Sequence, residues 1–219
     1  MQISKFKRFL SDAGLLAKNK ATPFFELIKR LGVNAEIAWG LILANLSYDN
    51  PQIEWYIRSM DVGRDYARQE LYDMIAATGL NSDGVMSVIR AFGRLCDIPL
   101  GLRLHFGRVS STGRDIVSLT RTKPEKPSPL VMLYALYKFA EKCGGYWEFS
   151  LSRLMDFTVE SEGVSPAQTF ALSRDEMEAI LNGLAHSNPD FITFTTTHDL
   201  ELIRLADDKT SSDVISLFN

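Results

Sequence analysis

The sequence is poor in the residue types that build most metal and disulfide sites. Its 219 residues include two cysteines, Cys96 and Cys143, and three histidines, His105, His186 and His198. A structural zinc site needs about four nitrogen or sulfur ligands at short spacing, and two cysteines cannot form a disulfide framework. We therefore expect no metal and no cofactor, and we expect both thiols to be reduced and buried beside apolar helices.

Long apolar runs are also missing. No run reaches the ~18 residues that a membrane-spanning helix needs. Residues 1–14 carry Lys5, Lys7 and Arg8 without the apolar stretch of a secretion signal. Apolar residues make up 46% of the chain and charged residues 23%, which is typical of a folded globular protein. The sequence predicts a soluble, cytoplasmic protein that does not contact a membrane.

The glycine and serine motifs of common enzymes do not occur. The chain holds no G-x-x-x-x-G-K-[ST], G-x-G-x-x-G or G-x-S-x-G pattern, so neither a phosphate-cradling loop nor a hydrolase serine is indicated. One pattern resembles restriction-type nucleases, because Pro189-Asp190 precedes a predicted strand and Asp207-Asp208-Lys209 follows the next one. In those enzymes the acids hold Mg²⁺ and the lysine orients water. Lys209 falls beyond the predicted strand, so we expect a non-catalytic protein and keep a Mg-dependent nuclease as an alternative.

Charge is distributed unevenly along the chain. Residues 1–30 and 90–126 each carry a net charge of +5, residues 141–219 carry −9, and the whole chain carries −3. A basic segment attracts phosphate or an acidic protein surface, including the acidic C-terminal half of the same chain. Arginine predominates in residues 90–126, and its planar guanidinium binds phosphate in a bidentate manner. We predict that duplex DNA or an acidic partner is contacted by Arg90, Arg94, Arg103, Arg108, Arg114, Arg121 and Lys123.

The first half of the chain is predicted to be helical and to end in a β-hairpin. Residues 81–96 place apolar side chains on one helix face, with Arg90 and Arg94 on the opposite face. Apolar alternation over residues 100–106 and 115–120 indicates two strands. Three prolines in residues 123–129 interrupt both helix and strand. We therefore place a helical domain with a basic hairpin at residues 1–122 and a Pro-rich linker at residues 123–129.

Residues 130–219 show the order of elements that is typical of a winged-helix domain: helix, short helix, helix, strand, tight loop, strand. Ser173 followed by Glu176 forms a capping box that opens the last of these helices, and residues 191–196 and 200–205 alternate as two strands. The overall prediction is a mainly α protein with small β-hairpins, of the α+β class, ending in a winged helix.

The predicted third helix of this winged-helix domain is acidic. Winged helices often place this helix in the DNA major groove, but here Asp175, Glu176 and Glu178 would face phosphate, and the predicted wing offers His198 and Asp199. We therefore expect the acidic C-terminal half to contact a partner protein. A winged-helix transcriptional regulator remains a further alternative.

Three stretches of the second half, residues 129–136, 163–174 and 191–205, resemble the C-terminal part of an uncharacterised bacterial family. Members of that family occur beside phosphoadenosine-phosphosulfate-reductase-like proteins in DNA-phosphorothioation and phage-defence loci. The most specific part is a Ser-Pro-x-x-x-Phe-x-Leu-x-Arg run from Ser165 to Arg174. Family members open with an additional N-terminal winged helix, and residues 1–31 differ from it. The resemblance implies a non-catalytic accessory subunit of a bacterial DNA-modification or anti-phage defence system, and it supplies no catalytic residues.

Overall fold

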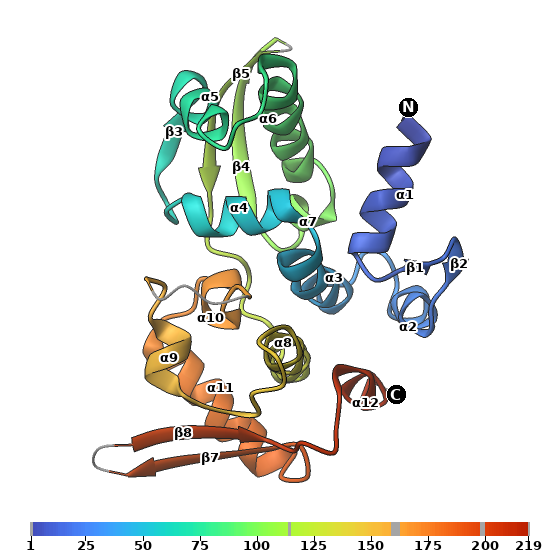
Figure 1. Ribbon diagram of the computed structural model, residues 1–219, viewed down its shortest axis with the longest axis vertical. Helices are drawn as coiled ribbons and strands as arrows, with labels where there is room; N and C mark the ends of the chain where they lie inside the picture. Colours follow the sequence, from blue (N-terminus) through green and yellow to red (C-terminus); the bar gives the residue numbers. More distant parts are fainter. Residues whose placement is uncertain (1, 114, 159–162, 198–199, 219) are drawn as a thin grey trace. The chain divides into compact units, whose positions relative to one another are not determined.

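The computed structural model describes residues 2–113, 115–158, 163–197 and 200–218, and it divides into two compact units (Figure 1). Unit 1 combines Met1–Arg58 with Lys126–Asn219, and unit 2 is the intervening segment Ser59–Glu125. No described helix is long and apolar enough to cross a membrane.

The elements of unit 1 are α1 (Gln2–Asp12), β1 (Leu16–Ala17), β2 (Lys20–Ala21), α2 (Pro23–Leu31), α3 (Glu36–Asp49), α4 (Pro51–Ser59, which ends at the boundary), α8 (Pro129–Lys142), β6 (Glu148–Ser150), α9 (Leu151–Met155), α10 (Pro166–Thr169), α11 (Arg174–Ser187), β7 (Ile192–Thr197), β8 (Leu200–Leu205) and α12 (Ser211–Ile215). The elements of unit 2 are β3 (Asp65–Ala67), α5 (Arg68–Ala76), α6 (Ser82–Cys96), α7 (Pro99–Leu102), β4 (Gly107–Thr112) and β5 (Asp115–Arg121).

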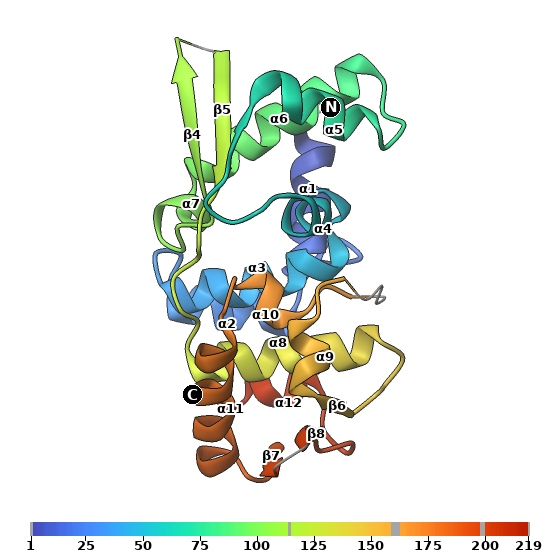
Figure 2. The ribbon, with the colours of Figure 1, turned by 90° about the vertical axis from the view of Figure 1, so that its left-hand side faces the viewer.

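The core of unit 1 is built on α3 and α8, which lie side by side in Figures 1 and 2. Both helices are apolar around most of their circumference and both are largely buried. Gly40 allows the close approach, because a Cβ at that position would lie 2.9 Å from Val131 Cγ1. The buried helix expected at residues 130–140 is thereby confirmed.

This packing gives a division of the chain that differs from the expected domains at residues 1–122 and 130–219. The N-terminal helices, including α4 up to Arg58, associate with the C-terminal segment rather than with the segment Ser59–Glu125 that follows them. The apolar surface of α3 is covered by α8, which lies about 80 residues further along the sequence. The second unit boundary, at Glu125 and Lys126, falls inside the Pro-rich segment 123–129.

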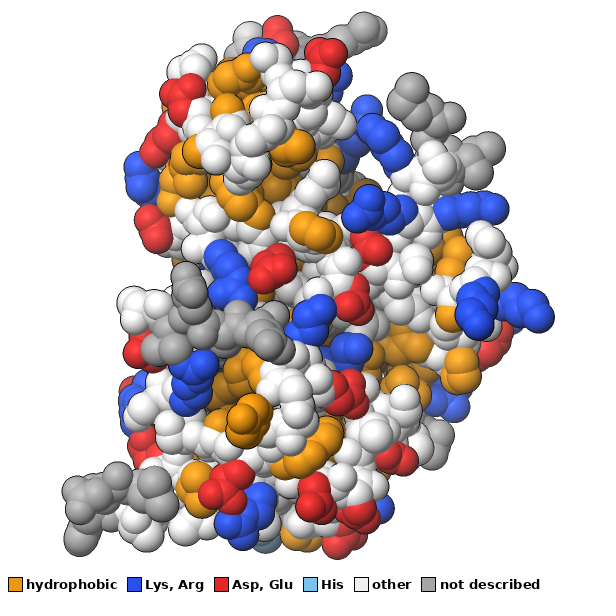
Figure 3. Space-filling view, in the orientation of Figure 1, with side chains coloured by type: hydrophobic (Ala, Val, Ile, Leu, Met, Phe, Trp, Pro, Cys, Tyr) orange, Lys and Arg blue, Asp and Glu red, His pale blue; other side chains and the backbone are white. Residues whose placement is uncertain are grey.

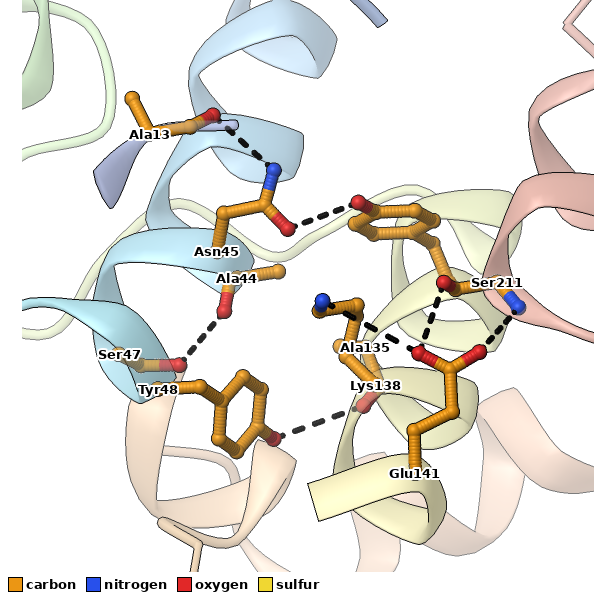
Figure 4. Close-up of polar contacts among 10 residues, drawn as sticks. Ala13, Ala44, Asn45, Ser47, Tyr48, Ala135, Lys138, Glu141 and Ser211 are labelled. Carbon is orange, nitrogen blue, oxygen red and sulfur yellow. Dashed lines mark hydrogen bonds and ion pairs between the residues drawn. The ribbon is translucent and has the colours of Figure 1, made fainter. Parts of the chain in front are cut away.

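Buried polar contacts connect the parts of unit 1 (Figure 4). Asn45 on α3 donates from Nδ2 to the Ala13 carbonyl at 3.0 Å, and its Oδ1 accepts from the Tyr134 hydroxyl of α8 at 2.7 Å. The Tyr48 hydroxyl donates to the Val164 carbonyl at 2.9 Å. These bonds attach the end of α1, and the segment before α10, to the two central helices.

Each unit contains a three-stranded antiparallel sheet of the same topology. In unit 2 the strand order is β3-β5-β4, and in unit 1 it is β6-β8-β7. In both sheets the last strand of the unit is central and pairs with the other two. A helix precedes the first strand along the chain in each case, and two or more helices separate the first strand from the second. The α+β class is confirmed.

Within the C-terminal part, the expected hairpin and capping box are confirmed. Strands β7 and β8 occupy almost the predicted residues. The Ser173 side chain accepts from the Glu176 amide, and the Glu176 carboxylate accepts from the Ser173 amide at 2.8 Å. The sequence did not indicate the first strands, β3 and β6, because three residues are too few to show an alternating pattern.

The strand predicted at residues 100–106 is wrong. Residues 99–102 form the short helix α7, and β4 begins only at Gly107. Pro99 suits the first turn of a helix because it needs no amide donor there. Leu102 is 63% exposed, whereas Leu100 and Leu104 are buried one helical turn apart. The alternation of these leucines comes from a helical turn followed by a tight bend and not from a strand. In the bend, His105 has a φ of 55°.

Candidate nucleic-acid interface

The candidate interface in unit 2 is centred on α6. The helix begins where the Asn81 side chain accepts a hydrogen bond from the Gly84 amide at 2.9 Å. Its buried stripe consists of Val85, Val88, Ile89, Phe92 and Gly93. At Gly93 a Cβ would lie 2.6 Å from Ile116 Cδ1, so the glycine allows the hairpin to pack closely against α6. The buried stripe fixes which face of α6 remains in solvent.

Arg90 and Arg94 lie on that solvent face, one helical turn apart, and both are exposed. Residues at this spacing are neighbours on a helix surface. Among the described residues, no carboxylate lies within the 4.0 Å ion-pair distance of either guanidinium. By contrast, Arg68 pairs with Asp115 at 3.3 Å. The arginines of α6 therefore present positive charge that no described acid of the chain neutralises.

The other predicted arginines of unit 2 occupy different places. Arg103 ends α7, which packs against α6, and it is exposed. Arg108 is exposed on β4. The next residue, Val109, points toward α6, because its Cγ2 would lie 3.8 Å from a Cβ added at Gly93. Because successive side chains of a strand point to opposite faces, Arg108 belongs to the sheet face that turns away from α6. We call the set Arg90, Arg94 and Arg103 the α6 surface.

Arg121 is not part of an exposed surface. Its residue is 3% exposed, and its Nη1 donates to the Met60 carbonyl at 3.0 Å. Its own carbonyl accepts from the Gly63 amide at 2.7 Å, so Arg121 fastens β5 to the segment before β3. The predicted phosphate contact of Arg121 is therefore corrected to a structural role. Lys123 is exposed beyond β5. Arg114 lies outside the described residues.

In unit 1 the residues of the nuclease-like pattern do come together. Asp190, Asp208, Lys209 and Asp213 line a cavity of about 450 Å³, with Phe191 and Ser216. Asp208 pairs with Lys209 at 3.4 Å. Asp213 accepts from the amide and the hydroxyl of Thr210, and these two bonds lower its pKa. Lys209 lies beyond β8, and the described part of the chain holds no cluster of three acids, histidines or cysteines placed to bind a metal.

The helix α11 carries the opposite charge to α6. Its first turn contains Asp175 and Glu176, and Glu176 is already engaged in the capping box. Arg174 pairs with Glu201, so the cation at this end of the helix is neutralised within the unit. Asp175 remains exposed. The predicted wing residues His198 and Asp199 lie outside the described residues.

The two cysteines do not form a disulfide with each other, and both are partly buried. Cys96 ends α6 and its Sγ donates to the Phe92 carbonyl at 3.5 Å. Burial, together with the nearby Asp97 carboxylate, raises the pKa of the Cys96 thiol from 9.0 to about 11. The thiol is therefore protonated at neutral pH, which suits a structural residue rather than a nucleophile.

This raised pKa gives a measurable expectation. In a Cys143→Ser variant, Cys96 should react with a disulfide reagent at pH 8 at least about tenfold more slowly than an ordinary thiol, because little thiolate is present. The rate should rise with pH until about pH 11. The same variant in urea should react at the ordinary rate. Fast reaction of the folded variant at pH 8 would contradict the buried state of this thiol.

No protein-family model and no curated protein matches the sequence. Two solved structures do match the fold: an SspB crystal structure and a magnesium ion-bound SspB crystal structure. Each superposes with a TM-score of 0.67 at 13% sequence identity, over 96% of this chain and 73% of the other. The chain shares the SspB fold. The likeness covers residues of both units, and at this identity it concerns the fold alone.

Proposed function

We propose that this protein is a non-catalytic accessory subunit of a bacterial DNA-modification or anti-phage defence system, and that it contacts duplex DNA through the α6 surface. The observation that carries the proposal is the pair Arg90 and Arg94, exposed one turn apart without a described carboxylate partner. The resemblance to a family of phosphorothioation and phage-defence loci supplies the biological setting. The likeness to SspB is consistent with that setting.

The topology supports α6 as the DNA-contacting helix. In both units we interpret the order of elements and the sheet with its last strand in the centre as a winged-helix arrangement. In such a domain the helix before the hairpin is the one that enters the major groove. In unit 2 we assign this position to α6, with the four-residue helix α7 between it and the hairpin, and in unit 1 to α11. Charge separates the two, because α6 has one acid in its first turn, Asp83, and presents Arg90 and Arg94 further along, whereas α11 begins with Asp175 and Glu176.

Phosphate would be repelled by α11, so a different ligand is proposed for the acidic C-terminal part of unit 1. Asp175 is exposed in its first turn, and residues 141–219 carry a net charge of −9. Like charges at close range oppose association, whereas a basic protein surface is attracted. The proposed partner of this acidic half is another protein subunit of the same modification or defence complex.

The α6 surface is tested by fluorescence anisotropy of a labelled duplex over a salt series. The affinity should fall linearly in log[salt], because each neutralised phosphate releases counterions. The double variant Arg90→Glu, Arg94→Glu should bind at least about 30-fold more weakly near 0.1 M salt, with a slope about 2 smaller. A double variant Lys142→Glu, Arg153→Glu is the matched control, since both residues are exposed in unit 1 and the change in net charge is identical.

Circular dichroism confirms that each variant is folded. Equal losses of affinity in the α6 variant and in the control would contradict the proposed surface, since net charge alone would then explain the effect.

Duplexes of unrelated sequence should bind alike, and selection of one sequence as a two-fold site would favour the transcriptional regulator instead. We expect no cleavage when Mg²⁺ is added. Cleavage that depends on Mg²⁺ and is lost in Asp190→Ala would make the protein a nuclease.

A further inference from the structure

A second basic surface lies in unit 1, at the N-terminus. Figure 3 shows Lys and Arg side chains gathered over α1 and the β1–β2 ribbon. The residues that form it are Lys5 and Lys7 on α1 and Lys18 and Lys20 at the ribbon, and all four are exposed. We call these four lysines the N-terminal basic surface. The candidate interface of unit 2 contains none of them.

The four lysines have no acidic partner in the described ranges of the chain, where no carboxylate lies within 4.0 Å of their ammonium groups. Their neighbours differ from them in this respect. Arg8 lies 3.9 Å from Asp12, and Lys29 lies 3.8 Å from Glu26. Lys5 and Lys7 lie on different sides of α1, so in a chain with a net charge of −3 these four unpaired lysines raise the positive potential around α1 and the ribbon.

The ribbon holds its lysines in a defined position. Leu16 pairs with Ala21 and Ala17 with Lys20, so only Lys18 and Asn19 form the turn. Both turn residues have positive φ, of 49° and 63°, as in the tight turns that match the twist of a hairpin. A short ribbon with this turn presents Lys18 and Lys20 on a fixed backbone rather than on a mobile loop.

The joint between α1 and the ribbon is anchored to the core. The Thr22 hydroxyl donates to the Gly14 carbonyl at 2.7 Å, and Asn45 donates to the Ala13 carbonyl at 3.0 Å. Gly14 has a φ of 75° and a Cβ there would lie 2.6 Å from Asn45 Nδ2, so the chain passes directly over this amide. The orientation of α1 is therefore set by a buried residue of α3.

An exposed aromatic residue lies between the lysines of α1. Phe6 is 61% exposed and is flanked by Lys5 and Lys7. Aromatic rings between basic residues occur where proteins contact nucleic acid; stacking on the ring needs unpaired bases, so on a duplex the flanking cations carry the contact. They also occur in helices that lie on anionic membranes. The hydrophilic ribbon beside α1 favours the nucleic acid, since Lys18, Asn19 and Lys20 offer no apolar side chain for insertion into lipid.

We propose that the N-terminal basic surface binds the phosphate backbone of duplex DNA. This inference rests on the proposed function, and it adds a second contact independent of α6. Lysine ammonium groups bind phosphate as point charges, so the contact should be insensitive to sequence and strongly dependent on salt.

The test uses the full chain and the same labelled duplex. The double variant Lys5→Glu, Lys7→Glu should bind DNA at least about tenfold more weakly near 0.1 M salt, with a slope about 2 smaller. Lys18→Glu, Lys20→Glu should act similarly. The control is again Lys142→Glu, Arg153→Glu. Because all these side chains are exposed, melting curves should match that of the unchanged protein, and Lys5→Gln, Lys7→Gln provides a milder variant.

The outcomes separate this inference from the proposed function. If the unchanged protein binds no duplex at low salt, both fail. If it binds, and the α6 variant loses affinity while both N-terminal variants bind normally, only the N-terminal basic surface is overturned. Co-sedimentation with phosphatidylserine vesicles tests the alternative ligand, an anionic membrane. The inference would be overturned if Lys5→Glu, Lys7→Glu lost vesicle binding while its DNA binding was unchanged, because the surface would then be assigned to membranes.

Discussion

Replacing Gly101 with alanine should destabilise the protein by about 3 kcal/mol and lower its melting temperature by roughly 6–12 °C. Gly101 lies in α7, and a Cβ there would overlap the Cα and the carbonyl oxygen of Cys96. Both contacts are with backbone at the end of α6, which cannot move aside by rotating a side chain. The variant must displace α7 or shift the end of α6, and thermal melting followed by circular dichroism measures the cost.

Two other glycines provide matched controls for this substitution. Gly183 lies within α11, and a Cβ added there would have no other atom within 4 Å, so Gly183→Ala should stabilise the protein by about 0.5–1 kcal/mol. Gly93→Ala should fall between the two, since the clash is with the end of the Ile116 side chain. A melting temperature of Gly101→Ala equal to that of Gly183→Ala would show that α7 does not pack as described.

The second large effect is expected at Asn45. This side chain is 3% exposed and bridges the Ala13 carbonyl and the Tyr134 hydroxyl. Asn45→Leu removes both bonds and leaves two buried polar groups without this partner, which should cost about 2–5 kcal/mol. Burial raises the pKa of Tyr134, so its hydroxyl stays protonated at pH 7 and can donate to Asn45. Urea denaturation at pH 7 measures the loss.

A double-mutant cycle distinguishes the bridge from a simple packing defect. Tyr134→Phe alone should cost about 1–3 kcal/mol, because the Asn45 oxygen loses its donor. Adding Tyr134→Phe to Asn45→Leu should cost much less than it does alone, since the unpaired hydroxyl is then removed as well. Strictly additive losses would contradict a direct bond between the two side chains. The residual cost of the double variant reports the bond to Ala13.

Much of the secondary structure could be predicted because its signals are local. The capping box at Ser173 and Glu176, the buried helix at residues 130–140 and the last hairpin depend on neighbours in the sequence. The association of residues 1–58 with residues 126–219 could not be predicted in this way. It depends on Gly40 meeting Val131 and on Asn45 meeting Tyr134, and neither pair leaves a pattern in the sequence.

The candidate site was predicted as a segment rather than as a surface. Counting charge identified Arg90 and Arg94, whose helical spacing also predicted their exposure. The same counting included Arg121, because charge alone does not show that a guanidinium is folded back onto a backbone carbonyl. Arg108 was grouped with them in sequence, but strand alternation places it on the other face of the sheet. The N-terminal lysines were counted, but the ribbon that positions them was not foreseen.

The insertion of unit 2 between the two segments of unit 1 has a consequence for synthesis on the ribosome. Unit 2 is continuous in sequence and precedes α8, so all of its residues leave the ribosome before those of α8. Its strands and helices can close while translation proceeds. Helix α3 emerges earlier still, with an apolar surface that α8 covers only after some 80 further residues have been added. Early translation products therefore carry a folded insert beside an uncovered helix, and this interval is when the nascent chain is most exposed to aggregation or chaperone capture.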